Sequence, residues 1–245
     1  MLAVLVVAAV SGCPGASERY LQAGHQHARR GAWQKALEQY EGAAAADPSC
    51  ARCLSLAGLA NQHLGRSQPA ADAFTRALAV EGSEAGARVG LGALAVEAAD
   101  AGAALSWLEG VVTPGAELVR GRALLLRGNP QDAELALTAA RAALTALPGS
   151  IEARYLEGSA LLALARYAEA QTAFETLERS ARDSAFGPYG LARVAAAQQR
   201  STDVLLYLKA ARAAAREAWQ ARAVAADPAF AFLAGSPAFS EAVGP

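Results

Sequence analysis

The sequence predicts an all-α protein, an α-solenoid built as a superhelix of about five to six helix-turn-helix repeats with a C-terminal capping helical hairpin. Three observations lead to this fold class. Hydrophobic residues make up 53% of the chain but aromatic residues only 6%, because alanine, the strongest helix former, dominates. Six glycines recur at intervals of 34, 34, 29, 37 and 32 residues. Turn signals such as Asp47-Pro48 and Pro148-Gly149 separate the helical stretches.

The recurring glycines set the register of the repeats. They are Gly24, Gly58, Gly92, Gly121, Gly158 and Gly190. The residues twelve positions later are small, namely Ala36, Ala70, Ala104, Ala133, Ala170 and Thr202. The residues sixteen positions later are large and apolar, namely Tyr40, Phe74, Leu108, Leu137, Phe174 and Leu206. Small residues let two helices cross closely, and the large residue fills the gap to the next repeat, so stacked repeats share one continuous core.

The pattern resembles the tetratricopeptide repeat, a unit of two antiparallel helices with a period of about 34 residues. The first copy carries the resemblance through Tyr20, Gly24, Gly31, Trp33, Ala36, Tyr40, Ala43 and Pro48. The second copy does so through Leu54, Gly58, Gly65, Ala70, Phe74 and Ala77, and the fifth through Gly158, Tyr167, Ala170 and Phe174. The third, fourth and sixth copies are degenerate. The resemblance covers about residues 17–216.

The repeat boundaries follow from the register and the turn signals. The approximate repeats are 17–50, 51–84, 85–113, 114–150, 151–182 and 183–218, which together form an array over 17–218. Residues 219–245 contain DPAFAFLAGSPAF, which resembles the tail that often closes tetratricopeptide arrays. We expect its aromatic residues to cover the apolar edge of the last repeat, as a terminal cap must.

The N-terminal segment predicts the cellular location of the protein. The nine apolar residues 2–10 suit the hydrophobic region of a signal peptide, and Val10-Ser11-Gly12-Cys13 resembles the bacterial lipobox. We expect cleavage of residues 1–12 before Cys13, a lipid on Cys13, and a tether over 13–16. Pro14 rather than aspartate after the cysteine favours the outer membrane, facing the periplasm. The alternative is that residues 1–16 extend the first helix, although Gly12, Pro14 and Gly15 are helix breakers.

Composition and motifs argue against several classes of function. Lysine and arginine number 22 and the acidic residues 23, so no basic footprint for nucleic acid exists. No nucleophile elbow, phosphate-binding loop or zinc-protease motif occurs. His25 and His27 are two residues apart and face different sides of a helix, so they do not form a metal-binding pair. We therefore expect no enzymatic activity, no cofactor, no metal and no small-molecule substrate.

Cys50 and Cys53 form a Cys-x-x-Cys motif at the predicted start of a helix. Three interpretations stay open at the level of sequence. The pair forms a local disulfide, or it consists of two small packing residues, or it takes part in thiol exchange, since a helix N-terminus lowers a thiol pKa. The motif lacks the strand pattern of a thioredoxin-like domain.

The resemblance implies that the first helix of each repeat lines a concave groove that holds a partner. In the first two repeats the inward positions are Glu18, Leu21, His25, Arg29, Arg52, Ser55, Gln62 and His63, which makes this end polar and mildly basic. In repeats four to six they are Leu118, Leu125, Leu126, Tyr155, Leu162, Leu191 and Val194, which makes this end apolar. Such a surface suits a segment with an apolar face and an acidic end. The alternative is that these leucines belong partly to the core.

Together these observations predict a non-enzymatic protein–protein interaction scaffold, anchored through Cys13 in the bacterial envelope. Its expected partner is another envelope protein, because the sequence resembles the tetratricopeptide lipoproteins that act as pilotins for pilus secretins or assist outer-membrane assembly. Fold and anchor carry this analogy. Two alternatives stay open: an intracellular adaptor without lipid, and a thiol-active envelope protein that uses Cys50 and Cys53.

Overall fold

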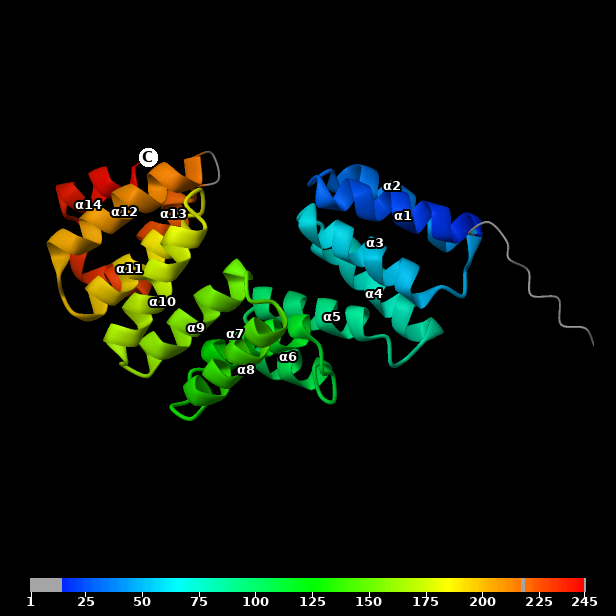
Figure 1. The fold of residues 1–245 in the computed structure, drawn as a ribbon, viewed down its shortest axis with the longest axis horizontal. Coiled ribbons are helices and arrows are strands. Elements are labelled where there is room, and N and C mark those ends of the chain that lie inside the picture. Colours follow the sequence, from blue (N-terminus) through cyan, green and yellow to red (C-terminus); the bar gives the residue numbers. More distant parts are fainter. Residues whose placement is uncertain (1–14, 217–218, 245) are drawn as a thin grey trace, which may run out of the picture. The chain divides into compact units, whose positions relative to one another are not determined.

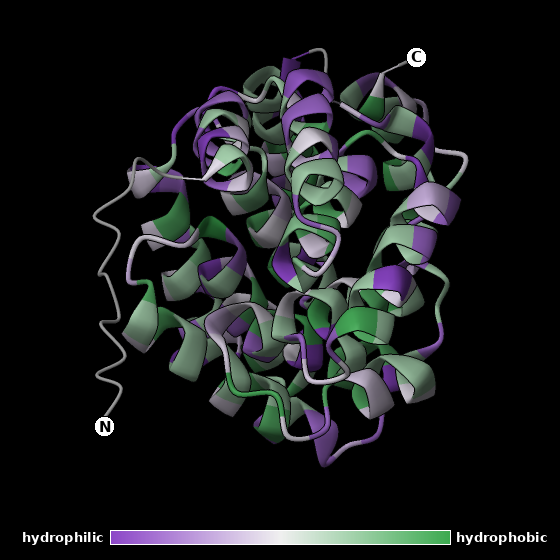
Figure 2. Ribbon diagram, turned by 90° about the vertical axis from the view of Figure 1, so that its right-hand side faces the viewer, coloured by the Kyte–Doolittle hydropathy of each residue, from purple (hydrophilic) through white to green (hydrophobic). Residues whose placement is uncertain are grey.

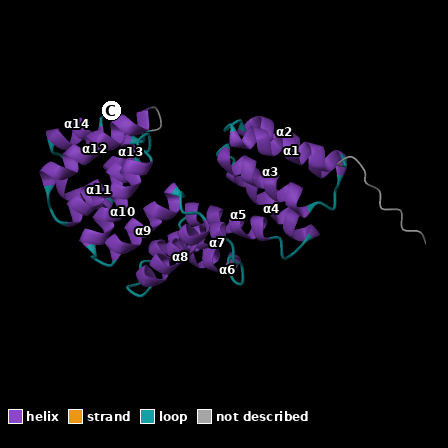
Figure 3. Cartoon of the chain, in the orientation of Figure 1, coloured by secondary structure: helices purple, strands orange, loops and turns teal. Residues whose placement is uncertain are grey.

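The computed structural model describes residues 15–216 and 219–244, and in this part of the chain every regular element is a helix (Figure 3). The all-α prediction is confirmed for these residues. The chain divides between Leu94 and Ala95 into two compact parts, called here the N-terminal and the C-terminal part. Each part is described by itself.

The helices follow one another along the chain in pairs (Figure 1). Those that begin in the N-terminal part are α1 (Ala16–Arg29), α2 (Trp33–Ala46), α3 (Ala51–His63), α4 (Ser67–Val80) and α5 (Ala85–Glu97), whose last residues belong to the C-terminal part. The pairs of the C-terminal part continue with α6 (Ala101–Trp107), α7 (Pro114–Arg127), α8 (Asp132–Ala146), α9 (Ile151–Ala163), α10 (Tyr167–Ser180), α11 (Phe186–Ala197) and α12 (Ser201–Ala215). The chain then ends in α13 (Ala221–Ala225), the 3₁₀ helix η2 (Pro228–Leu233) and α14 (Pro237–Val243).

A residue with left-handed backbone stands in the turn between the two helices of every pair. These residues are Gly31, Gly65, Ala99, Gly128, Ala165 and Gln199, with φ angles of 70°, 71°, 59°, 72°, 56° and 56°. In the first five pairs this residue comes seven positions after the glycine that set the register. In the sixth pair it comes nine positions after Gly190 and seven after Ala192. The sixth repeat therefore takes its register from Ala192.

Burial in the sixth pair supports this correction of the predicted register. Counting from Gly190 gave Thr202, Leu206 and Lys209, but all three are exposed, and Leu206 has 63% of its surface accessible. Counting from Ala192 gives the small–large–small set Val204, Leu208 and Ala211, each 0% exposed. The sequence pattern was misread because Gly190 stands two positions before Ala192, the small residue that sets the register of this helix pair.

Phe174 of α10 explains why Gly190 is a glycine. A Cβ atom at Gly158, in the same repeat, would lie 2.6 Å from the Phe174 ring, and a Cβ atom at Gly190 would lie 2.2 Å from it. Both distances are shorter than van der Waals contact, so the ring fills the space that two missing side chains leave. Each glycine is sixteen residues from Phe174, one before it and one after it.

The N-terminal part repeats this arrangement around Phe74 of α4. The Phe74 ring lies 2.6 Å from a Cβ built on Gly58 and 2.2 Å from one built on Gly90. Gly90 therefore closes over the ring, while the predicted register glycine Gly92, also buried, comes seven positions before the turn residue Ala99. Tyr40 occupies the equivalent place in the first repeat, with its ring 2.5 Å from a Cβ built on Gly24. In the fourth repeat Gly121 faces Leu156 of the next repeat, at 2.5 Å.

The C-terminal helices close the core of the sixth repeat, as expected of a cap. Phe230 of η2 and Phe239 of α14 are 1% and 5% exposed, and both pack in the cluster that contains Val204 and Leu208. Phe232, also expected to cover the edge, is 49% exposed. Side chains start both cap helices, because Asp227 accepts a hydrogen bond from the Ala229 N–H and Ser236 accepts one from the Phe239 N–H.

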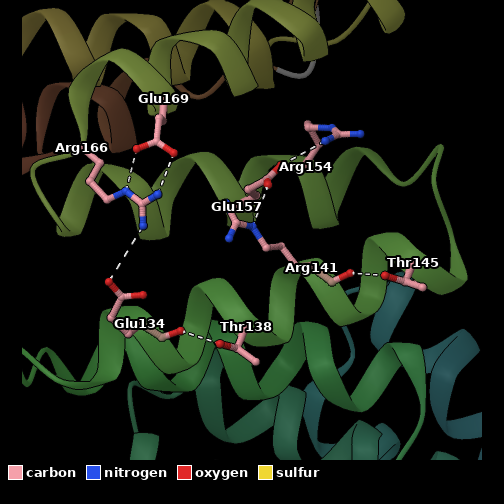
Figure 4. Close-up of polar contacts among 8 residues, drawn as sticks. All are labelled: Glu134, Thr138, Arg141, Thr145, Arg154, Glu157, Arg166 and Glu169. Carbon is pink, nitrogen blue, oxygen red and sulfur yellow. Dashed lines mark hydrogen bonds and ion pairs between the residues drawn. The ribbon is translucent and has the colours of Figure 1, made fainter.

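Ion pairs link the fourth and fifth repeats on their outer surface (Figure 4). Arg166 lies between Glu169, at 2.6 Å, and Glu134, at 3.9 Å. Glu157 receives Arg154 at 3.0 Å and Arg141 at 3.4 Å. Glu134 and Glu169 are more than half exposed, so these pairs add little stability and form a solvated face.

Hydrophobic and hydrophilic residues alternate along the described helices (Figure 2). Among the residues that the structure describes, no helix combines the length and the apolar character needed to cross a membrane.

The left-handed turn residues give a test of the repeat register. We expect Ala165→Gly to stabilise the protein by roughly 0.5 kcal/mol, because it relieves an alanine held at φ 56°, at some cost in chain entropy. Gly65→Ala should destabilise it by roughly 1 kcal/mol, and since no atom lies within 4 Å of the added Cβ, the effect comes from the backbone alone. Urea unfolding measures both variants. Changes of the opposite sign would contradict the assigned turns.

Candidate interaction site

The first helices of repeats four to six form a continuous layer in the C-terminal part. α7 contacts α9 and α9 contacts α11, and these contacts are more extensive than those between neighbouring second helices. Helices that approach one another more closely lie on the inner side of a curved stack. The surface that these three helices present is called here the first-helix face.

The structure separates the predicted groove residues of this part into two groups. Leu126 is 43% exposed, whereas Leu118, Leu125, Tyr155 and Leu162 are half-buried. Leu125 and Leu162 also pack against the core cluster around Phe174, in line with the alternative that the leucines serve partly as core.

Leu191 and Val194 are core residues, at 2% and 1% exposure, which corrects their assignment to the groove. Their placement followed from the register taken at Gly190. The inward positions lie six and three residues before the register residue and one, four and five after it. Counted from Ala192, the large side chains at these positions are Phe186, Tyr189 and Arg193, and the other two are alanines. The sequence analysis missed these three residues, because the register follows from the left-handed backbone of Gln199, and a glutamine carries no turn signal in the sequence.

Aromatic rings form the apolar portion of the first-helix face. Tyr155 of α9 and Phe186 of α11 have ring centroids 5.0 Å apart, and Tyr155 also lies 5.5 Å from Phe174 in the core below. Phe186 is 45% exposed. An aromatic side chain of this size that stays half in solvent on a concave layer is typical of a binding surface.

Next to these rings a polar cluster joins α11 to the cap. The Tyr189 hydroxyl donates a hydrogen bond to Asp227 Oδ2, while Asp227 Oδ1 accepts the Ala229 N–H at 2.9 Å. Arg193 Nε lies 3.7 Å from Asp227 Oδ2, which is an ion pair without a hydrogen bond. Burial raises the pKa of Tyr189, and the hydrogen bond to Asp227 raises it further, so the phenol stays protonated and acts as the donor.

Two buried polar atoms in this region have no hydrogen-bond partner. Among the described residues, such atoms are Ser159 Oγ and Arg193 Nε. Ser159 follows Gly158 and Arg193 follows Ala192, so the two residues occupy the same position in adjacent repeats. Polar atoms of this kind are rare inside proteins and call for an explanation.

The predicted groove residues of the N-terminal part include a second polar cluster. The Tyr40 hydroxyl lies 3.1 Å from His25 Nδ1, and Arg29 Nε donates to the His25 carbonyl oxygen at 3.4 Å. Burial lowers the pKa of His25, and the positive charges of Arg52 and Arg29 lower it further. Arg29 and Arg52 are exposed. This cluster is basic, as the sequence predicted for this end.

The other predicted residues of this part differ in accessibility. Leu21 and Ser55 are 8% and 5% exposed and belong to the interior, and a Cβ at Gly86 would lie 2.7 Å from Ser55 Oγ. Glu18 is exposed and Gln62 is half-buried. The His63 ring stacks on the Trp33 indole, with centroids 3.7 Å apart and planes 5° from parallel, and this burial lowers the pKa of His63.

Cys50 and Cys53 form a disulfide in the structure, so of the three interpretations of this motif the structure shows the local disulfide. The Cys53 N–H donates to Cys50 Sγ at 3.1 Å, and this contact caps α3. Cys53 is 0% exposed. In the described part of the chain no three His, Cys, Asp or Glu side chains are placed to hold a metal ion. Cys13 and the predicted signal segment 1–12 lie outside the described residues.

No protein-family model matches the sequence, and no curated protein matches it. Solved structures do. PilW, a widely conserved type IV pilus biogenesis factor, aligns with 85% of this chain and 96% of its own length at a TM-score of 0.64 and 16% identity.

Two further solved structures are similar. The pilF protein of Pseudomonas aeruginosa aligns with 81% of this chain and 91% of its own, at a TM-score of 0.58 and 17% identity. A tetratricopeptide repeat protein from Parabacteroides merdae aligns with 93% and 97%, at a TM-score of 0.55 and 16% identity. At these identities the likeness shows the fold, which is that of the tetratricopeptide repeat proteins.

The two shifted histidines predict how stability depends on pH. His25 and His63 have folded-state pKa values below the ordinary 6.5, so the unfolded chain binds more protons just below that pH. Their contribution to stability is present above pH 6.5 and is lost as pH falls through the lowered values. We expect the free energy of unfolding in urea to drop between about pH 7.5 and pH 5, and the drop to be smaller in a His25→Asn/His63→Asn double variant. Equal pH dependence in the two proteins would contradict the assignment.

Proposed function

We propose that this chain is a non-enzymatic scaffold that binds a segment of another protein on its first-helix face. The observation that carries the proposal is the exposure of Leu126 and Phe186, at 43% and 45%, on first helices that belong to one continuous layer. Large apolar side chains that stay exposed beside polar groups mark sites of association. The half-buried Leu125, Tyr155 and Leu162 extend this surface with apolar area that a partner can cover.

The N-terminal part adds a basic contact surface of its own. Arg29 and Arg52 are exposed close to His25, and no ion pair of either arginine is found within the described residues. Exposed cations without an internal acid favour an acidic stretch of the partner and speed its encounter with the protein. We propose it as a separate contact surface of the N-terminal part.

We further propose that the scaffold works in the bacterial envelope, held there by a lipid on Cys13. Two observations support this placement. Val10-Ser11-Gly12-Cys13 resembles a lipobox, and PilW, a fold neighbour, is a type IV pilus biogenesis factor. By this analogy the partner is another envelope protein, such as a pilus secretin or a component of outer-membrane assembly, and the anchor lies in the outer membrane facing the periplasm. The rival is an adaptor inside the cell without lipid.

Metabolic labelling with a palmitate analogue tests the anchor. Wild-type protein expressed from its full sequence in bacteria should incorporate the label, and Cys13→Ser should not, because the thioether to the lipid forms on that sulfur. The Cys50→Ser/Cys53→Ser variant is the matched control and should keep the label. A wild-type protein without label, or a labelled Cys13→Ser variant, would support the intracellular adaptor.

Site-specific crosslinking tests the binding surface. A photoreactive amino acid at position 126 or 186 should trap the same envelope protein from living cells, because both positions lie on the first-helix face. Leu135 and Leu206, on the second helices α8 and α12, are 55% and 63% exposed and serve as controls that should not trap it. A Leu126→Glu/Phe186→Glu variant should lose the complex at unchanged helix content. Equal crosslinking from the control positions would contradict the proposed face.

A further inference from the structure

We infer that Arg193 binds an Asp or Glu side chain of the partner segment, next to an apolar side chain that contacts Phe186. The inference rests on the proposed function and specifies the chemistry of the segment. The part of the surface that selects the partner then lies where the fifth and sixth repeats meet.

Arg193 has the donors for this task. Its guanidinium carries five N–H groups, and the side chain is 32% exposed, so part of the group reaches solvent. The Nε atom is buried without a hydrogen bond, and Asp227 is held at 3.7 Å, beyond hydrogen-bonding distance. The charge is thus partly removed from water, with the Tyr155 oxygen and Asp227 at 3.7 Å as its internal partners, which favours an added carboxylate.

The surroundings of Arg193 select for a single negative charge. Tyr155 from α9 contacts the guanidinium, and its hydroxyl can donate to a bound carboxylate, whereas the Tyr189 hydroxyl of α11 already donates to Asp227. Asp227, 16% exposed, already carries one negative charge beside the arginine. A doubly charged phosphate would meet stronger repulsion from Asp227 than a carboxylate does, so the cluster favours Asp or Glu.

The apolar neighbour of the acidic residue follows from the same geometry. Phe186 lies one helical turn before Tyr189 on α11 and packs against Tyr155, with ring centroids 5.0 Å apart. Ser159, whose hydroxyl is buried and unpaired, stands in α9 at the position that Arg193 has in α11. A partner that places an apolar side chain on Phe186 therefore has its next residues over Ser159 and Arg193.

A purely structural role of Arg193 makes the opposite prediction for one variant. If Arg193 serves only to hold the cap against α11, replacing Arg193 and replacing Asp227 should weaken partner binding to the same extent. If Arg193 binds the partner, Asp227 competes with the partner carboxylate, and Asp227→Asn should strengthen binding. Asparagine keeps Oδ1 to accept the Ala229 N–H, and its Nδ2 amide can donate to the Tyr189 oxygen, so the cap stays in place.

Selection from a random peptide library on phage tests this inference with the full chain. The peptides are fused through their C-termini, so only side chains supply carboxylates. Wild-type protein should select peptides with Asp or Glu beside an aliphatic or aromatic residue. Measured by fluorescence anisotropy, Arg193→Gln should weaken such a peptide by about tenfold or more, and Asp227→Asn should tighten it by about twofold or more. Arg182→Gln, at an exposed turn, should change nothing.

The outcomes separate this inference from the proposed function. Selected peptides that are apolar without an acid, or a loss of affinity in Asp227→Asn as large as in Arg193→Gln, would overturn the inference while the scaffold proposal stands. A peptide that binds equally to the Leu126→Glu/Phe186→Glu variant, or a selection without enriched peptides, would count against both. A glutamine version of the best peptide should bind as weakly to wild-type protein as the acidic peptide does to Arg193→Gln.

Discussion

The contact between a phenylalanine and two glycines sixteen residues on either side of it holds the second repeat to the third and the fifth repeat to the sixth. Phe74 and Phe174 are each almost fully buried against a glycine of their own repeat and a glycine of the following one. A ring held in this way sets both the crossing of the helix pair and the distance to the neighbouring pair. In the C-terminal part the first helices then form a layer whose surface positions recur once in every repeat, and the proposed binding surface depends on that recurrence.

The same constraint explains why the degenerate repeats keep the fold. Leu108 and Leu137 replace the aromatic ring in the third and fourth pairs, and both are buried. The left-handed residue between the helices persists even where it is alanine or glutamine, at Ala99, Ala165 and Gln199. The left-handed backbone of the turn therefore recurs from pair to pair more strictly than the residue type that adopts it, because the chain must reverse at the same position in each pair.

The surface chemistry differs between the two parts for a physical reason. Near His25 the first helices carry exposed arginines without acidic partners, whereas near Tyr155 they carry aromatic rings and one arginine that is two-thirds buried. Exposed charges act at long range and are screened by salt, while a desolvated arginine among rings acts at contact and rewards a matching group. The two parts thus differ in the type of recognition that we propose for them. The disulfide at Cys50 and Cys53 serves as a cap of α3.

The sequence by itself determined the all-helical repeat fold, the glycine–aromatic spacing and the cap, because these follow from local periodicity and from side-chain size. It also predicted Leu126 and Tyr155 as groove residues, and the structure leaves Leu126 exposed and Tyr155 half-buried. Only the tertiary structure decided the sixth register, since Gly190 and Ala192 are both small and the choice depends on the left-handed turn at Gln199 and on the burial of Val204 and Leu208. That choice moved Leu191 and Val194 into the core and brought Tyr189, Arg193 and Asp227 together across 38 residues of chain, a proximity that no local pattern encodes.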